Sequence, residues 1–391
     1  GLGSGNRLAA QNTVTVHNAH TGKTEQIEVP VGLAIDEDSL LNEWKASNYL
    51  EADTDCEDPD YNPEYPNEIY KDRLLRLPTI VEMTYNDVVQ KFIDRYTGQE
   101  RRLVSAMLGA SNFYIPIFEE ALDYYGLPLE LKYLPVVESA LNPNAISPAG
   151  ASGLWQFMTA TAKQYGLAIN SRIDESRDPI KSSWAAAKML RDYFKIYGDW
   201  HLVLAAYNCG PGNVNKALHR AEGSRNYWDI YPYLPAETRG YVPAFIAANY
   251  VMNYYCVHNI CPMKTLQPLL SDTISVQHNI DLRQISELCS VDIEFLKSLN
   301  PQYRTDLIPG LAGKCTLRLP QEAIAKYIEN EARLTGEEGA AYIKAHGSQL
   351  PDPHSASTHY GSKEIETLDH DAISETEATR KTPTTKPATK K

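Results

Sequence analysis

The stretch that decides the fold is Gly126-Leu-Pro-Leu-Glu-Leu-Lys-Tyr-Leu-Pro-Val-Val-Glu138-Ser139. It predicts a helix that opens at Gly126–Pro128, with positions i, i+4, i+7 and i+11 on one face, namely Leu127, Leu131, Leu134 and Glu138. Glu138 therefore continues an apolar stripe. A glutamate in such a place either pairs with a buried cation as a structural group or lines a cleft with its pKa raised by desolvation.

Two neighbouring features favour a functional site. Pro135 falls inside the expected helix, where a proline removes a backbone hydrogen bond at a cost of about 3 kcal/mol. Such violations of local rules are typical of functional sites. A loop rich in Gly, Pro and Asn follows at residues 142–153, and loops of this type let a ligand approach the backbone closely. It continues into Leu154-Trp-Gln-Phe-Met158, after which Thr159 is expected to cap another helix.

A third cluster, Ala205-Ala-Tyr-Asn-Cys-Gly-Pro-Gly212, ends an apolar helix and presents the phenol of Tyr207 and the amide of Asn208. Taken alone, it is equally typical of a helix stop with a core tyrosine. Upstream, Asp178-Pro179 predicts a helix start, and Gly198 predicts its end. Asp199 is then expected to cap the apolar run from Trp200 to Tyr207.

Length and charge limit the function classes. The 391 residues predict two or three domains, and the net charge of −13 argues against a nucleic-acid partner. The longest stretch without a charged residue, 240–263, contains prolines and asparagines and predicts a buried helix followed by a loop, not a membrane span.

The six cysteines and ten histidines show no Cys-x-x-Cys and no His-Glu-x-x-His spacing, so we expect no metal site. Cys256 and Cys261 are close in sequence, as are Cys289 and Cys315. Buried thiols and an export-linked disulfide both remain open.

The chain divides into five parts, and the fold class is mainly α. Residues 1–84 predict an acidic, proline-rich arm that is extended and weakly structured and that we expect to pack on the helical domain, because residues 36–68 hold twelve acidic residues and one basic residue. Residues 85–262 predict an all-α domain, and residues 271–322 a small β-α-α-β unit. Residues 323–350 are assigned as a helical extension and residues 351–391 as a disordered tail.

The three clusters, in this order, resemble the soluble lytic transglycosylase family. The matching residues are Glu138-Ser139, Gly153-Leu-Trp-Gln-Phe-Met158, and Ala206-Tyr-Asn208 followed by Gly210-Pro-Gly212. The resemblance covers about residues 85–255 and implies a lysozyme-like all-α catalytic domain. The β-α-α-β unit resembles a LysM module, a peptidoglycan-binding fold, although Asn279-Ile-Asp281 replaces the usual Gly-Asp-Thr.

The resemblance implies that Glu138 is the single catalytic acid and base. The reaction would cleave the β-1,4 bond between N-acetylmuramic acid and N-acetylglucosamine and give a 1,6-anhydro product, without metal or cofactor. The implied substrate-binding residues are Ser147, Gln156, Met158, Tyr207, Asn208 and Tyr241, of which Tyr241 is equally typical of a core tyrosine. A lysozyme-like muramidase and a non-catalytic peptidoglycan-binding protein are the alternatives.

The implied partners are peptidoglycan glycan strands, with no nucleic acid. The implied location is the periplasm or the outer membrane surface. No signal sequence is visible, and Gly1-Leu-Gly-Ser-Gly5 is compatible with a mature start, so peripheral or lipid-anchored membrane association stays open. The sequence does not determine the oligomeric state or the choice between exo and endo cleavage.

Overall fold

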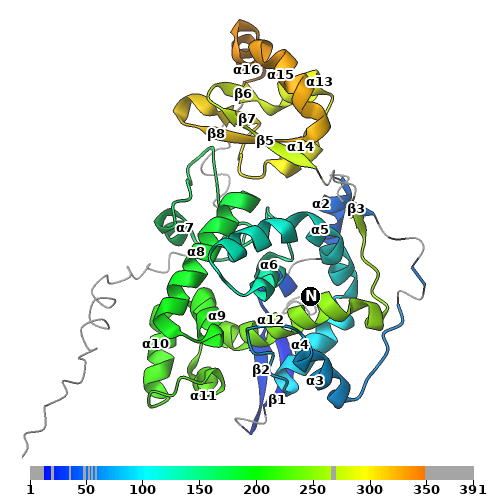
Figure 1. The fold of residues 1–391 in the computed structure, drawn as a ribbon, viewed down its shortest axis with the longest axis vertical. Helices are drawn as coiled ribbons and strands as arrows, with labels where there is room; N and C mark the ends of the chain where they lie inside the picture. The colour runs from blue at the N-terminus through cyan, green and yellow to red at the C-terminus, as the bar shows by residue number, and fades with distance from the viewer. Residues whose placement is uncertain are drawn as a thin grey trace, which may run out of the picture. The chain divides into compact units, whose positions relative to one another are not determined.

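Helices make up most of the protein. The computed structural model describes residues 13–18, 22–34, 37–46, 50–51, 53, 56–57, 60–265 and 270–347. Figure 1 shows a large helical body and a smaller unit of strands and helices that follows it in the chain. The predicted fold class, mainly α with a small β-containing module, is confirmed.

The helical body is built around one apolar core. Its longest helices are α5 (Arg101–Tyr124), α8 (Pro179–Tyr197) and α12 (Ala236–Tyr254). The helices α4 (Asp87–Thr97) and α9 (Trp200–Cys209) pack against α12. Shorter helical segments complete the body, namely α7 (Thr159–Gln164), α10 (Pro211–Arg220), α11 (Tyr227–Ile230), η3 (Tyr231–Tyr233) and η4 (Tyr255–His258).

The stretch without charges forms most of α12, a helix buried along nearly its whole length. It is followed by η4 and a loop, as the sequence predicts. Within the described part of the chain, no helix combines the length and the apolar character needed to cross a membrane.

Local capping signals act as predicted. The Asp178 side chain accepts hydrogen bonds from the backbone N–H groups of Ile180 and Lys181, and α8 ends at Gly198 with φ = 64°. Asp199 caps α9 in the same way. The expected cap at Thr159 is displaced by one residue, because Met158 is the N-cap and provides no side-chain hydrogen bond.

The deciding stretch folds as two short helices instead of one. A 3-10 helix, η2 (Leu129–Tyr133), is followed by α6 (Leu134–Ser139). Pro135 therefore lies in the first turn of α6 and not inside a helix. The prediction of a strained proline was wrong, because the first-turn N–H has no partner within the helix that a proline would remove.

The N-terminal region is more ordered than the sequence suggests. Strands β1 (Thr13–Asn18) and β2 (Lys23–Glu28) form an antiparallel hairpin, and η1 (Val31–Leu33) follows. Their side chains Val16, Ile27 and Leu33 are buried in the core of the helical body. The expectation of a weakly structured arm was therefore wrong for these described residues. Two helices complete the region, α2 (Glu37–Ala46) and α3 (Asn67–Leu75).

Described parts of the acidic segment, residues 36–68, are bound to the chain just after the C-terminal end of α12. A disulfide joins Cys56 to Cys261, and the short strands β3 (Leu50–Glu51) and β4 (Lys264–Thr265) pair beside it. The Tyr65 hydroxyl donates to the Val257 carbonyl at 2.7 Å. The described residues of this segment thus pack on the helical body. The cysteines that are close in sequence do not pair, since Cys256, Cys289 and Cys315 are free.

The C-terminal module has its own small core. Strand β5 (Ser271–Val276) pairs with β8 (Cys315–Pro320), and α13 (Leu282–Cys289) and α14 (Ile293–Leu299) lie between them in the chain. This is the predicted β-α-α-β order, to which the structure adds the pair of β6 (Asn279–Asp281) and β7 (Leu307–Pro309) and the turn η5 (Gly310–Ala312). The helical extension is α15 (Gln321–Thr335) and α16 (Glu337–His346); the tail from 351 to 391 lies outside the described residues.

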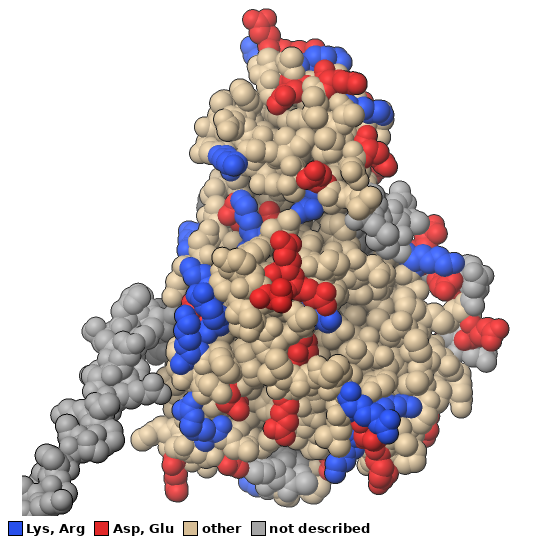
Figure 2. All heavy atoms as spheres, in the orientation of Figure 1, with Lys and Arg blue, Asp and Glu red and all other residues tan. Residues whose placement is uncertain are grey.

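Charged groups are unevenly distributed over the surface. On the face in Figure 2, a group of acidic side chains lies near the centre, and lysines and arginines lie along the left edge.

Gly32 lies where η1 packs directly on the backbone of α6, so a substitution at this position tests the packing of the two segments. A Cβ at this position would lie 2.5 Å from the Val137 carbonyl oxygen, so the backbone of one segment must move. We expect Gly32→Ala to lower the free energy of unfolding by about 1–3 kcal/mol, as overpacking does. Gly212→Ala is the control, since nothing lies within 4 Å of its Cβ. If the two variants unfold at the same urea concentration, η1 does not pack closely on α6.

Candidate active site

Glu138 lies in the last turn of α6 and is almost completely buried, with 8% of its surface exposed. The hydroxyl of Tyr241, on α12, donates a hydrogen bond to its Oε1 at 2.5 Å. Burial raises the pKa of Glu138 to about 8, although the bond from Tyr241 acts in the opposite direction. The carboxyl group is therefore mostly protonated at neutral pH and can act as an acid.

Two tyrosines surround this carboxyl group as neutral donors. Tyr241 is fully buried, and the Tyr207 hydroxyl donates to the Trp155 carbonyl oxygen at 2.8 Å. Burial and the nearby Glu138 charge raise the pKa of both tyrosines well above the ordinary value. Both phenols thus keep their protons. The structure brings Tyr207 and Tyr241, two of the predicted substrate-binding residues, close to Glu138.

A second carboxylate approaches the site from α12. Glu237 lies one turn before Tyr241, and its charge raises the pKa of Glu138 further. The Asn208 side chain bonds to Glu237 and accepts a hydrogen bond from the Thr238 hydroxyl at 2.8 Å. The sequence analysis missed Glu237, although its i, i+4 spacing from Tyr241 is the signal that could have identified it.

The loop of residues 142–157 is held by its own side chains. The backbone N–H of Ala151 donates to the Ser147 hydroxyl at 3.0 Å. The Gln156 amide donates to the carbonyl oxygens of Ala145 and Gly153 at 3.1 and 2.8 Å. Gln156 also has φ = 49°, a strained backbone conformation typical of functional sites. The structure thus gives Ser147 and Gln156 a role in shaping the loop, while Met158 is exposed at its end.

Ser139 connects this loop to the helix that carries Glu138. Its hydroxyl lies 3.0 Å from the Pro135 carbonyl oxygen and 2.9 Å from that of Leu154. Directly afterwards, Ala140 and Leu141 adopt positive φ angles of 49° and 61°. The chain therefore reverses immediately after the acid, and a fixed contact joins α6 to the start of the Leu154–Met158 segment.

The surroundings of Glu138 do not form a structural ion pair. In the part of the chain that the structure describes, no lysine, arginine or histidine forms a salt bridge to Glu138. The same residues hold no group of three or more His, Cys, Asp or Glu side chains that could bind a metal ion. Of the two interpretations that the sequence left open, the geometry favours a desolvated functional acid.

Comparison with protein families identifies the helical body. Residues 115–230 match the model of the transglycosylase SLT domain, which includes α6, the loop and α9. The chain contains a transglycosylase SLT domain. Residues 271–336 match the model described as the LysM-like domain of lytic transglycosylase MltD, which covers the C-terminal module and α15. The resemblance predicted from the three clusters is confirmed.

Individual relatives carry the same description. Over 241 residues the chain is 30% identical to membrane-bound lytic murein transglycosylase D of Escherichia coli K12, which covers 61% of this chain and 52% of that protein. Over 124 residues it is 33% identical to the soluble lytic murein transglycosylase of the same organism, covering 30% of this chain and 19% of that protein. The chain thus spans about half the length of the first of these relatives.

Among solved structures, the chain is similar to the 70 kDa soluble lytic transglycosylase of Escherichia coli. The sequences are 28% identical, the TM-score is 0.33, and the match covers 39% of this chain and 26% of that one.

Because Glu138 is buried, we expect the Glu138→Gln substitution to increase the free energy of unfolding by an amount that depends on pH. Because its folded-state pKa lies near 8, above the ordinary 4.5, Glu138 contributes stability that is fully present below about pH 4.5 and is lost as the pH rises through 8. The uncharged amide avoids this loss. We expect wild type and variant to unfold at similar urea concentrations near pH 4.5. The advantage of the variant should grow by about 1.4 kcal/mol for each pH unit between about 4.5 and 8 and should level off above pH 8.

The exposed Glu120→Gln substitution on α5 is the control for this measurement and should show no such trend. An advantage of Glu138→Gln that is equal at pH 5 and pH 9 would contradict the burial of an ionisable acid.

Proposed function

We propose that this chain is a lytic transglycosylase that cleaves the β-1,4 bond between N-acetylmuramic acid and N-acetylglucosamine in peptidoglycan. Glu138 is its single acid and base. One observation carries the proposal: within the residues that match the SLT domain, Glu138 is a desolvated carboxyl group whose pKa is raised to about 8, and among the described residues its hydrogen bond comes from the Tyr241 phenol. The names of the relatives as lytic murein transglycosylases support the same activity.

In the first step, Glu138 donates its proton to the glycosidic oxygen as the bond to the sugar C1 breaks. Positive charge develops at C1, where the acetamido oxygen of the same sugar can stabilise it from the other face. The Tyr241 hydroxyl already donates to Oε1 of Glu138. It therefore stabilises the carboxylate that this proton transfer leaves in a buried environment.

In the second step, the Glu138 carboxylate removes the proton from the 6-hydroxyl of the muramic acid residue. The freed oxygen attacks C1 and closes the 1,6-anhydro ring. The proton given to the leaving group is thus recovered, the acid returns to its starting state, and no water is consumed.

The remaining predicted residues would position the glycan. Asn208 is fixed between Thr238 and Glu237, which leaves a rigid amide beside the tyrosine pair. Gln156 and Ser147 shape the loop through their hydrogen bonds, so their proposed contribution is to fix the loop backbone that would contact the sugar. Met158 offers an exposed apolar surface. The Tyr207 hydroxyl donates to the Trp155 carbonyl oxygen, and this bond would hold the tyrosine ring near Glu138.

Glu237 gives a second candidate function, a lysozyme-like muramidase. A hydrolase needs a second carboxylate to activate water or to stabilise the cation. Glu237 is near enough to influence the pKa of Glu138, which makes it the residue to test for that role. The two reactions differ by one water in the product, because hydrolysis leaves a reducing end in place of the anhydro ring.

The proposed partners follow from the substrate. Peptidoglycan lies outside the cytoplasmic membrane, so we place the protein in the periplasm or at the outer membrane. The LysM-like domain supports an affinity for glycan strands. The disulfide between Cys56 and Cys261 is compatible with an oxidising compartment.

The test is to digest purified peptidoglycan with wild type, Glu138→Gln and Glu237→Gln and to identify the sugar ends by mass. We expect anhydro ends from wild type, and a rate at least about 100-fold lower for Glu138→Gln because general acid–base catalysis is lost. The wild-type rate should fall above about pH 8, as the acid loses its proton. Glu237→Gln should still give anhydro ends, with this fall shifted to lower pH.

Reducing ends from wild type would instead identify a muramidase. Unchanged product formation by Glu138→Gln would remove Glu138 from the mechanism.

A further inference from the structure

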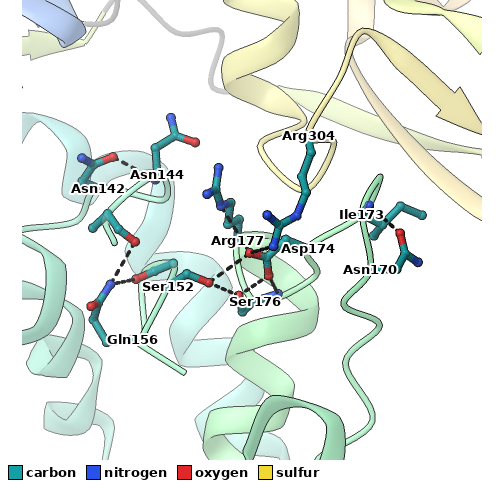
Figure 3. Close-up of polar contacts among 12 residues, drawn as sticks. Asn142, Asn144, Ser152, Gln156, Asn170, Ile173, Asp174, Ser176, Arg177 and Arg304 are labelled. Atoms are coloured by element: carbon teal, nitrogen blue, oxygen red, sulfur yellow. Dashed lines mark hydrogen bonds and ion pairs between the residues drawn. The ribbon is translucent and has the colours of Figure 1, made fainter. Parts of the chain in front are cut away.

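One buried carboxylate joins the C-terminal module to the loop of residues 142–157. Asp174, in the segment between α7 and α8, is 2% exposed. Its Oδ2 accepts a hydrogen bond from the Ser152 hydroxyl at 3.1 Å and pairs with a guanidinium nitrogen of Arg304 at the same distance. Figure 3 shows Arg304 reaching from the module to Asp174, with Ser152 and Gln156 on the other side of the carboxylate.

The backbone reinforces this contact. The N–H of Asp174 donates to the Gln302 carbonyl oxygen at 2.8 Å, and the N–H of Arg304 donates to the Arg172 carbonyl oxygen at 2.9 Å. Ile173 and Tyr303 form the bridge between these two bonds. The module therefore contacts the segment before α8 through paired backbone as well as through a side chain.

On the other side, Asp174 holds the loop at its centre. Ser152 exchanges two backbone hydrogen bonds with Phe157, of 3.0 and 3.1 Å, and also bridges to Ile146. The next residue, Gly153, lies so close to Ser176 that a Cβ would fall 1.9 Å from its carbonyl oxygen. Any shift of Ser152 is therefore transmitted to both halves of the loop, which carry Ser147 and Gln156.

We propose that Arg304 of the LysM-like domain is a positioning residue for this loop, so that the module supports catalysis through Asp174 and Ser152. The inference rests on the proposed function of the SLT domain, and it assigns the module a role beyond any affinity for glycan.

The positive charge of Arg304 influences Ser152 because both side chains contact the same carboxylate oxygen of Asp174. A buried carboxylate is stable only when cations and hydrogen-bond donors satisfy its oxygens. The other cation within reach, Arg177, has its Nε 3.4 Å from Oδ2, a longer contact than that of Arg304. Ser176 donates to the other oxygen, Oδ1, and its hydroxyl also lies within hydrogen-bond distance of the Ser152 hydroxyl. Without Arg304, we therefore expect Oδ2 to turn toward Arg177 or toward water, which shifts the acceptor of the Ser152 hydroxyl.

The kinetic test compares Arg304→Ala with Arg333→Ala, on insoluble peptidoglycan and on short soluble glycan oligomers. Arg333 forms an exposed ion pair with Glu338 away from this contact. The Arg333→Ala control therefore also removes one Arg–carboxylate pair, but not the pair with Asp174. We expect kcat of Arg304→Ala to fall about tenfold or more on both substrates, because misplaced positioning groups cost this much. KM and wall binding should change little, and Arg304→Lys should recover part of the loss. Arg333→Ala should match wild type.

A second readout does not depend on activity. Hydrogen exchange of the backbone amides in residues 145–157 should accelerate in Arg304→Ala and in Ser152→Ala, and should stay unchanged in Arg333→Ala. If wild type proves inactive on peptidoglycan, the proposed function fails. The hydrogen-exchange comparison then tests by itself whether Arg304 stabilises the loop. Unchanged exchange and unchanged kcat would overturn the inference. A loss confined to binding of insoluble wall would also overturn it, since Arg304 would then act as part of a glycan-binding surface.

Discussion

The cost of burying one carboxyl group governs this site. Glu138 ends a short helix within an apolar core, and its only direct polar contact described is the Tyr241 hydroxyl. Removal from water opposes ionisation more strongly than one phenol can favour it, so the pKa of Glu138 rises to about 8. The same group can therefore give a proton at neutral pH and hold the resulting charge briefly against Tyr241.

The raised pKa of Glu138 requires that its buried environment stays fixed. Segments that are distant in sequence pack around α6 and hold it in place. The turn η1 packs on the backbone of α6 at Gly32, and Gly240 of α12 lies equally close to Glu28 of β2. On the opposite side, Ser139 fixes the start of the loop, and Asp174 fixes its centre. The N-terminal residues thus pack against the helices that carry Glu138 and Tyr241, and the C-terminal module contacts the loop through Asp174.

The sequence predicts those features that depend on neighbouring residues. The caps at Asp178 and Asp199 act within one turn, and the order of the module follows from local pattern. The apolar spacing likewise identifies Glu138, although the helix break before Pro135 depends on tertiary packing and was missed.

Contacts between distant segments leave no such local signal. The packing of the N-terminal hairpin and the disulfide across 205 residues could not be predicted for this reason. The site itself was predicted mainly through resemblance. Glu237 was missed because its effect on Glu138 depends on the packing of α12 against α6.

The most direct measurement is the titration of Glu138 itself. Carboxyl carbon NMR of the protein labelled at glutamate, compared with the Glu138→Gln variant, assigns its signal by difference. We expect a single group that titrates near pH 8 and remains protonated at pH 6. A signal that titrates near the ordinary 4.5 would contradict it, because Glu138 would then be ionised at neutral pH and could not serve as the acid.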